Sequence, residues 1–421
     1  MTDARPADEL PGPPAGSGFT MLAGIRVLDI TTSYAGPYAS LLLADMGAEV
    51  IKFERLGTGD DCRHWGPPFL DDESLWFLSV NRNKKSVEID YRRDAGRKVL
   101  LGLAAKADIV INNQLPKVRV KLGSDYESLK AAKEDLIYVS LTGFGVGNFR
   151  QDWPSYDLIA EGYSGIMDMT GEIESGAQKV GTPATDLLAG MDAAMASASA
   201  LQARARTGKG CLIDIALVDS MSRFLMPWMA SYLGSGTLHR RSGGRESVIS
   251  IYQTFETADD PLTLGLGNDG LFRRFWNAVG QPEVADEPTY ATNSDRRAVR
   301  PELVKRIQDV LKTRPRAKWL ELFAEEGVPA GPINRLDEVA RDPVMLERGM
   351  FYQMKRGGRT PVPQINTGIL VDGAANAPST PPPALGEHTR SVLSDLLDYG
   401  DDDFKTLEAE GVIPASEGEQ S

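Results

Sequence analysis

The stretch GIRVLDITTSYAGPYASLLLADMGAEVIKFE, residues 24–54, decides the fold of this chain. The apolar run at 25–30 predicts a buried strand, residues 38–47 predict a short helix, and residues 49–54 predict the next strand. A strand, a helix and a second strand in this order form a βαβ unit, which opens a parallel sheet.

The same alternation continues along the chain. Further strands are predicted at 86–91, 108–113, 136–144 and 211–217, with a helix at 94–106 between the first two. Parallel strands with helices on both faces form a doubly wound sheet, so the fold class is α/β with a Rossmann-like large domain.

Three further helices are predicted where the pattern has a helical period. The segment 155–170 ends at Gly171, a longer helix runs from Asp186 to Arg206, and a third covers residues 218–233.

A smaller α+β domain follows a break in the pattern at residues 235–247. A hairpin is predicted at 249–269, with helices at 271–280 and 304–314. We therefore expect a disordered lead at 1–20, the N-terminal part of the large domain at 21–225, a small domain at 226–325, and a return to the large domain with a C-terminal tail at 326–421.

Composition places the chain among soluble globular proteins and excludes several classes. Its 421 residues are 42% hydrophobic and 25% charged, with a formal net charge of -13. Phosphate backbones are bound by clustered Lys and Arg, so nucleic acid is not expected as a partner. No apolar run reaches the roughly 18 to 20 residues that span a bilayer, so we expect no membrane association and a cytoplasmic location.

Cysteine and histidine are too scarce for most metal and disulfide chemistry. The two cysteines, Cys62 and Cys211, exclude a disulfide framework and a Cys-rich zinc site. The three histidines are widely separated and lack the HExxH spacing of a metal-binding helix. We therefore expect no metal and a reducing compartment.

Other nucleotide and hydrolase motifs are absent or incomplete. The stretch GFGVGN at 143–148 is followed by Pro154 where a dinucleotide helix would begin, and GTGDD at 57–61 lacks the ending of a P-loop. No Gly-x-Ser-x-Gly elbow occurs. Asp186, at the start of its predicted helix, is either an N-cap or a nucleophile, because an ordinary aspartate is ionised at neutral pH without a partner base.

Several motifs together resemble the family III CoA-transferases over residues 22 to about 414. The motifs are residues 24–69 (GIRVLDITTSYAGPYASLLLADMGAEVIKFERLGTGDDCRHWGPPF), SVNRNKKSVEIDYR at 79–92, ADIVINN at 107–113, SYDLIAEGYSGIMDMTG at 155–171, VGTPATDLLAG at 180–190, RTGKG at 206–210 and GVPAGPIN at 327–334.

The resemblance implies that Asp186 is the catalytic nucleophile, in an Asp-x-x-x-Gly stretch that Gly190 completes. Its carboxylate would attack an acyl-CoA to give a mixed anhydride and then an aspartyl-CoA thioester, from which CoA passes to the acceptor acid. Such a mechanism needs no tightly bound cofactor, because the CoA thioester is a substrate, and it requires that water be excluded.

The resemblance also implies the residues of the substrate sites and an interlocked homodimer. Tyr156 and Asp157 would lie at the acyl site, and Gly243 with Gly244 would form a lid. The implied CoA contacts are Tyr34, Ala35, Arg55, Ile89, Asp90, Tyr91, Arg92, Asn113, Gln114, Leu115 and Lys121.

Residues 59–69, 78–86 and 327–334 are most similar to the branch that moves CoA between dicarboxylates, with succinyl-CoA as donor. Arg63, His64 and Arg82 are candidates to bind the distal carboxylate of such an acid.

Two alternatives stay open. A related α-methylacyl-CoA racemase needs a second acid or base, and that branch has a catalytic His where this chain has Tyr156, whose ordinary pKa is near 10. A non-catalytic acyl-CoA-binding protein would keep the fold without using Asp186 as a nucleophile.

Overall fold

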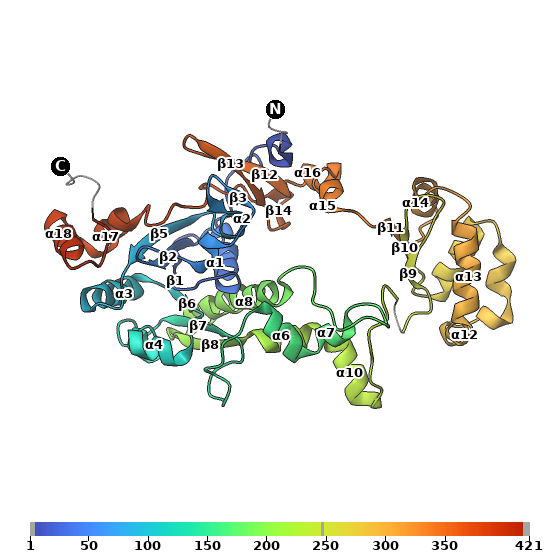
Figure 1. Cartoon of the computed structure of the whole chain (residues 1–421), viewed down its shortest axis with the longest axis horizontal. Coiled ribbons are helices and arrows are strands. Elements are labelled where there is room, and N and C mark those ends of the chain that lie inside the picture. Colours follow the sequence, from blue (N-terminus) through green and yellow to red (C-terminus); the bar gives the residue numbers. More distant parts are fainter. Residues whose placement is uncertain (1–4, 246–247, 416–421) are drawn as a thin grey trace. The chain divides into compact units, whose positions relative to one another are not determined.

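The computed structural model describes residues 5–245 and 248–415 (Figure 1). Internal contacts divide the chain into two compact units. The first unit includes the residues up to Ile166, Val180–Ala230 and the residues from Ala340 onwards, and the second includes Met167–Lys179 and Ser231–Val339.

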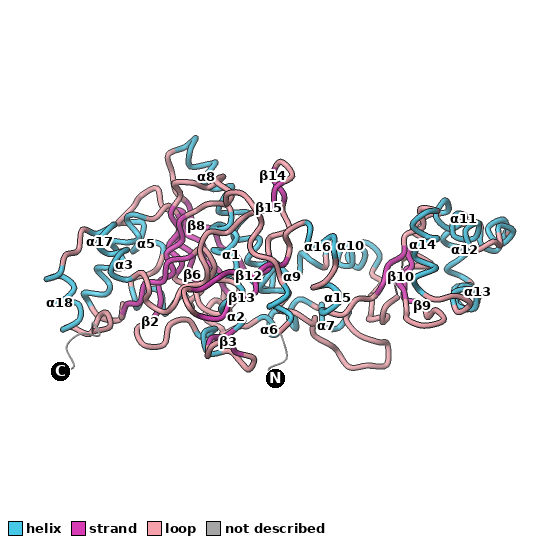
Figure 2. Tube along the Cα trace, turned by 90° about the horizontal axis from the view of Figure 1, so that it is seen from above, coloured by secondary structure: helices cyan, strands magenta, loops and turns pink. Residues whose placement is uncertain are grey.

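A six-stranded parallel sheet forms the centre of the first unit, with the order β5-β2-β1-β6-β7-β8 (Figure 1). Figure 2 shows strands β2, β6 and β8 of this sheet in magenta, with helices in cyan around them. Counted along the chain, these strands are the third, second, first, fourth, fifth and sixth of the sheet, so the direction of winding reverses between β1 and β6. Such a reversal opens a crevice beyond the carboxyl ends of the two strands, where ligands of doubly wound sheets bind. The strands are β1 (Arg26–Asp29), β2 (Glu49–Arg55), β5 (Lys84–Ile89), β6 (Ile109–Asn112), β7 (Ile137–Thr142) and β8 (Cys211–Ala216).

Apolar side chains cover both faces of the sheet, as a doubly wound fold requires. On β1, Val27 packs in one core cluster with helix α1 (Ala35–Asp45) and helix α8 (Ala184–Thr207). The next residue, Leu28, packs in a second cluster with helix α3 (Asp94–Lys106). Helices α17 (Thr389–Leu397) and α18 (Asp401–Ala409) complete that second cluster. The predicted α/β class and parallel sheet are therefore confirmed.

Two of the predicted helices are interrupted. In place of one helix at 155–170, a first helix, α6 (Asp157–Ser164), ends before Gly165. Gly165 has a φ of +94°, a left-handed conformation that favours glycine and ends helices. The helix expected at 218–233 divides into α9 (Leu217–Phe224) and α10 (Met226–Ser235). Pro227 has no backbone N–H to donate to the preceding turn, so a continuous helix cannot pass through it.

Smaller elements surround the sheet in the first unit. They are α2 (Leu75–Ser79), α4 (Pro116–Leu122), α5 (Tyr126–Lys130), α16 (Pro343–Glu347) and the two-stranded pairs β3–β4 (Phe69–Leu70, Glu73–Ser74), β12–β13 (Phe351–Arg356, Arg359–Ile365) and β14–β15 (Leu370–Val371, Ala374–Ala375).

The segment expected as a disordered lead, residues 1–20, has contacts with the C-terminal part of the chain. Gln353 donates hydrogen bonds to the carbonyl oxygens of Leu10 (2.7 Å) and Pro11 (2.8 Å). The backbone N–H of Phe19 donates to Asn376 Oδ1 at 2.9 Å. These bonds hold the segment from residue 10 to residue 19 against its neighbours, and residues 1–4 lie outside the described part of the chain.

The second unit contains a three-stranded antiparallel sheet with the order β11-β10-β9. Strands β9 (Tyr252–Phe255) and β10 (Leu262–Gly265) form the predicted hairpin, and β11 (Ala330–Pro332) extends the unit beyond the expected end at residue 325. Its core contains Trp276 and Trp319, both fully buried. Its main helices are α11 (Asp269–Ala278), α12 (Asn293–Ala298), α13 (Arg300–Leu311) and α14 (Arg316–Glu325).

Within the described ranges, no helix combines the length and the apolar character that crossing a bilayer requires.

Candidate active site

Two loops meet at the crevice where the sheet reverses its winding. One follows β1 and contains Thr32, and the other follows β6 and contains Asn113. The Asn113 side-chain amide donates to the carbonyl oxygen of Thr32 at 2.8 Å, and its Oδ1 accepts from the backbone N–H of Thr32 at 3.1 Å. One side chain therefore satisfies both backbone groups of a residue at the centre of the crevice and joins the two loops.

Asp186 lies in the first turn of α8 and lines a cavity of about 220 Å³ at this crevice. Only 9% of the residue is exposed. The other lining residues come from the end of β7, from the segments that follow β1, β2, β6 and β7, and from the start of α1 and α9. They are Thr32, Ser33, Tyr34, Ala35, Asp61, Asn113, Leu115, Leu141, Thr142, Gly143, Pro154, Ser155, Tyr156 and Leu217.

The N-terminus of α8 is capped by Asp157 and not by Asp186. Pro183 occupies the cap position and has no capping side chain. Oδ1 of Asp157 accepts from the backbone N–H groups of Thr185 at 2.8 Å and Asp186 at 3.3 Å, so the cap comes from the first residue of another helix, α6. The capping interpretation of Asp186 is therefore wrong, and its carboxylate stays available to the cavity.

The surroundings of Asp186 disfavour its charged form. Burial raises the pKa of the Asp186 carboxyl to about 7, and the nearby carboxylate of Asp157 adds to this shift. The expectation that Asp186 behaves as an ordinary, fully ionised aspartate at neutral pH is therefore wrong. Instead, the group titrates near neutral pH, where its basicity and nucleophilicity are higher than those of an exposed carboxylate.

A second, larger cavity of about 900 Å³ lies in the same unit. Four cationic residues, Arg55, Arg92, Arg97 and Lys121, lie among its lining residues. The remainder of the lining consists of Thr32, Leu56, Thr58, Ile89, Asp90, Tyr91, Gln114, Leu115, Val118 and Leu122. A cavity of this size and charge suits an extended ligand with several phosphate groups.

The two cavities share Thr32 and Leu115 as lining residues, so they adjoin each other. The predicted CoA residues divide between them. Tyr34, Ala35 and Asn113 line the cavity of Asp186, whereas Arg55, Ile89, Asp90, Tyr91, Arg92, Gln114 and Lys121 line the large cavity, and Leu115 lines both.

Some lining residues had not been predicted. Arg97 is on helix α3, where a surface position and an ion pair with Asp94 give no sign of a ligand. Thr32 and Thr58 were missed because both are neutral residues in loops, although Thr32 lies within the motif that follows β1. Asp61 was missed too. It lines the small cavity and forms an ion pair with Arg55 of the large one.

Tyr156 and Asp157 are adjacent in the chain but occupy different places. Tyr156 lines the cavity of Asp186 and is 62% exposed. Asp157 is not a lining residue of either cavity, and its interactions are with the start of α8.

The three candidates for binding a distal carboxylate have other partners. Arg82 is buried and bonded to Asp45 at 2.5 Å and to Gln364 at 3.0 Å. Arg63 pairs with Glu54 at 2.7 Å and lies over a phenylalanine ring.

His64 Nε2 lies 3.0 Å from the carbonyl oxygen of Thr58. None of the three lines either cavity, so this interpretation is wrong: both arginines have carboxylate partners within the first unit.

Gly243 and Gly244, the expected lid, belong to the second unit. Gly243 has a φ of +66°, and its N–H donates to the carbonyl oxygen of Gly171 at 2.9 Å. Their role as a lid stays a prediction.

In the part of the chain that the structure describes, no three His, Cys, Asp or Glu side chains converge in a group that would hold a metal ion.

Comparison with known proteins gives consistent matches over nearly the whole chain. The model of the family described as CoA-transferase family III matches residues 22–389. A succinyl-CoA:glutarate CoA-transferase of Mus musculus is 38% identical over 94% of this chain and 91% of its own length. A succinate–glutarate CoA-transferase of Agrobacterium fabrum is 39% identical, covering 89% of this chain and 95% of the relative.

Among solved structures, a CaiB/BaiF family protein from Brucella suis is similar with a TM-score of 0.78 and 38% identity. The match covers 89% of this chain and 99% of that one.

Proposed function

The chain belongs to CoA-transferase family III and is a CoA-transferase, and we propose that it moves CoA from succinyl-CoA to a dicarboxylic acid such as glutarate through covalent intermediates on Asp186. The donor and the acceptor come from the names of the relatives. One observation carries the covalent mechanism: a buried carboxylate with a pKa of about 7 lines a cavity that adjoins a large, cationic one.

The proposed reaction consists of four exchanges at one carboxylate. Asp186 attacks the thioester carbonyl and the C–S bond breaks. CoA leaves as a thiolate, and the acyl group stays on Asp186 as a mixed anhydride. The thiolate then attacks the aspartyl carbonyl, which releases the donor acid and leaves an aspartyl-CoA thioester. The acceptor carboxylate then attacks the aspartyl thioester, which releases the thiolate and gives a second mixed anhydride. The thiolate attacks the acceptor acyl carbonyl of this anhydride, which gives the new acyl-CoA and regenerates Asp186, so no external acid, base or oxidant is consumed.

The large cavity is proposed to hold the nucleotide end of CoA. Arg55, Arg92, Arg97 and Lys121 would face its phosphate groups, and the shared residues Thr32 and Leu115 would lie beside the pantetheine arm. Tyr34, Ala35 and Asn113 would then lie around the thioester, with Tyr156 at the acyl group. Asp157 would act on Asp186 through its charge and the helix cap.

The racemase alternative is less well supported by the site. Exchange of an α-proton needs a base on each side of the carbon. Among the lining residues of the small cavity, the groups that could serve are Asp186, Asp61, Tyr34 and Tyr156. Asp61 is already paired with Arg55, and burial raises the pKa of the Tyr34 hydroxyl above its ordinary value. Covalent transfer needs only one reactive group in this cavity, the carboxylate of Asp186, whereas racemisation needs two.

Trapping separates the covalent mechanism from the alternatives. Enzyme incubated with succinyl-CoA and hydroxylamine should gain a hydroxamate at Asp186, seen by peptide mass spectrometry, and should lose activity in parallel. Asp186→Asn should show neither the modification nor transfer of CoA to glutarate. Asp192→Asn, on the same helix and paired with Arg223, is the matched control and should behave as wild type. Transfer by Asp186→Asn at the wild-type rate would refute the proposal.

The family resemblance also leads us to propose a homodimer. Sedimentation equilibrium over a range of concentrations should give twice the chain mass of 45.7 kDa, and a monomer at micromolar concentration would contradict it.

A further inference from the structure

The loop from Thr31 to Ala35 forms one wall of the Asp186 cavity. Thr32 lines both cavities, and Ser33, Tyr34 and Ala35 line the small one with Asp186. A displacement of this loop would therefore change the shape of the space in which a thioester meets the nucleophile.

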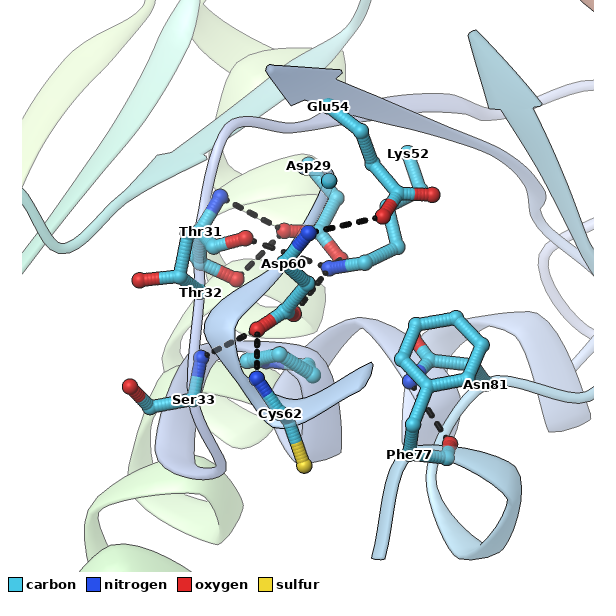
Figure 3. Close-up of polar contacts among 12 residues, drawn as sticks. Asp29, Thr31, Thr32, Ser33, Lys52, Glu54, Asp60, Cys62, Phe77 and Asn81 are labelled. Atoms are coloured by element: carbon cyan, nitrogen blue, oxygen red, sulfur yellow. Dashed lines mark hydrogen bonds and ion pairs between the residues drawn. The ribbon is translucent and has the colours of Figure 1, made fainter. Parts of the chain in front are cut away.

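Side chains bind every polar backbone group of this loop from Thr31 N to Ser33 N, and Figure 3 shows the bonds to Asp29, Lys52 and Asp60. Thr31 N–H donates to Asp29 at 2.9 Å, and Thr31 O accepts from Lys52 Nζ at 3.1 Å. Thr32 is bonded through both backbone groups by the Asn113 side chain described above. Ser33 N–H donates to Asp60 Oδ1 at 2.8 Å. The path of the loop is thus set by the neutral side chain of Asn113 at Thr32 and by charged side chains at Thr31 and Ser33.

Lys52 and Asp60 form the centre of this support. Their side chains are 0% and 1% exposed, and Lys52 Nζ lies 2.8 Å from Asp60 Oδ2 and 3.9 Å from Asp29. Oδ1 of Asp60 also accepts from Cys62 N–H at 2.9 Å, and the backbone N–H of Asp60 donates to Glu54 at 3.0 Å (Figure 3). Both charges are therefore paired and hydrogen-bonded, as buried charges must be.

Stability alone does not explain this pair. Burying two charges costs about as much as their attraction returns, so packed apolar residues of the same volume would serve the core equally well. The backbone of Ser33 also has a φ of +72°, a left-handed conformation that is unfavourable for a residue with a side chain and persists only where its surroundings enforce it. The bond from Ser33 to Asp60 supplies such enforcement.

We infer that Lys52 and Asp60 are positioning residues for the reaction at Asp186: the buried pair fixes the loop from Thr31 to Ala35 in the wall of the small cavity. This inference rests on the proposed function. Neither residue lines a cavity, so both act through the loop and not on the substrate.

The test compares two variants with a matched control. Asp60→Asn removes the carboxylate but keeps an oxygen that accepts from Ser33. The double variant Lys52→Met with Asp60→Asn leaves no unpaired buried charge and should fold even where the single variant does not. Asp45→Asn breaks an ion pair with Arg82 that is equally buried but does not contact the loop, so it controls for lost stability.

Transfer from succinyl-CoA to glutarate is measured below the lowest melting temperature of the set, together with hydrogen exchange of the Ser33 amide. In the two loop variants kcat should fall about 100-fold, since misplacing a reacting group by an ångström has an effect of that order. KM for succinyl-CoA should change little, because the large cavity is intact. Ser33 should exchange faster in both loop variants and not in Asp45→Asn.

Three results would overturn the inference. They are a folded double variant whose kcat equals that of wild type, a kcat lost equally in Asp45→Asn, and unchanged hydrogen exchange of the Ser33 amide in the loop variants. Failure of the proposed function is distinguishable, because wild type itself would then transfer no CoA.

Discussion

Asp157 accepts a hydrogen bond from the backbone N–H of Asp186 at 3.3 Å, so the two carboxylates lie close together at the start of one helix. The same oxygen accepts from Thr185, which makes Asp157 the cap of α8. A cap that carries negative charge also repels the charge of its neighbour, and the pKa of Asp186 is raised first by burial and then by Asp157. One side chain thus fixes the backbone of the proposed nucleophile and modifies its basicity.

The first prediction concerns the pH dependence of the reaction. The proposed mechanism requires an ionised Asp186, whose pKa is about 7, so kcat/KM should fall by about tenfold per pH unit on the acidic side of this value. The measurement is transfer from succinyl-CoA to glutarate between pH 5 and pH 9, with kcat/KM reporting the free enzyme. An acidic limb near pH 4 would show that Asp186 titrates as an exposed aspartate does.

The second prediction separates the two roles of Asp157. In Asp157→Asn the side-chain oxygen still accepts from Thr185 and Asp186, but the negative charge is gone. The acidic limb of kcat/KM should therefore move to lower pH, while burial keeps it above the ordinary range of an aspartate. Asp157→Ala should move the limb in the same direction and also cost about 1 kcal/mol of stability through loss of the cap. An unchanged limb in Asp157→Asn would mean that burial alone sets the pKa.

Much of the fold could be predicted because it depends on local patterns. The apolar strands and the helices between them follow from periodicity, and the parallel α/β class follows from their alternation. The end of α6 before Gly165 and the separate start of α10 at Met226 were not predicted. Gly165 and Pro227 are the local signals that explain these two breaks.

The parts of the site that could not be predicted depend on partners distant in the sequence. Asp157 caps a helix 29 residues away, and Arg82 has its carboxylate partner 37 residues away. The sequence alone does not show whether a charged residue is buried. Arg82 was therefore interpreted as a substrate-binding group, although it is buried and has a structural role. The raised pKa of Asp186 escaped prediction for the same reason, since it follows from burial.

The third prediction tests the cationic lining of the large cavity. Arg97→Gln and Lys121→Gln should each weaken binding of CoA about tenfold, because a hydrogen bond to a charged group contributes about 1.5 kcal/mol. Isothermal titration with CoA at two salt concentrations measures the effect, which should be smaller at high salt. Lys98→Gln, also on α3 but not a lining residue, is the control. If all three variants bound CoA as tightly as wild type does, the phosphate groups of CoA would not contact Arg97 or Lys121.

The fourth prediction is a conflict between function and stability at Asp186. Its carboxyl has a pKa of about 7 in the folded chain and about 3.8 as a free group, so between these values the folded state holds a proton that the unfolded state has lost. Stability must then fall as pH rises from about 4 to 7 and level off above that. Asp186→Asn removes this loss and should be more stable than wild type by up to about 4 kcal/mol at pH 8, with no gain near pH 4.

Urea denaturation at pH 4, 5, 6, 7 and 8 measures this difference, with Asp192→Asn as the control on the same helix. A gain in Asp186→Asn that is the same at every pH would come from packing and would contradict the titration of Asp186. A gain that grows with pH, in a variant that no longer transfers CoA, would show that the chain keeps an unfavourable buried carboxylate at the one position where the proposed chemistry needs it.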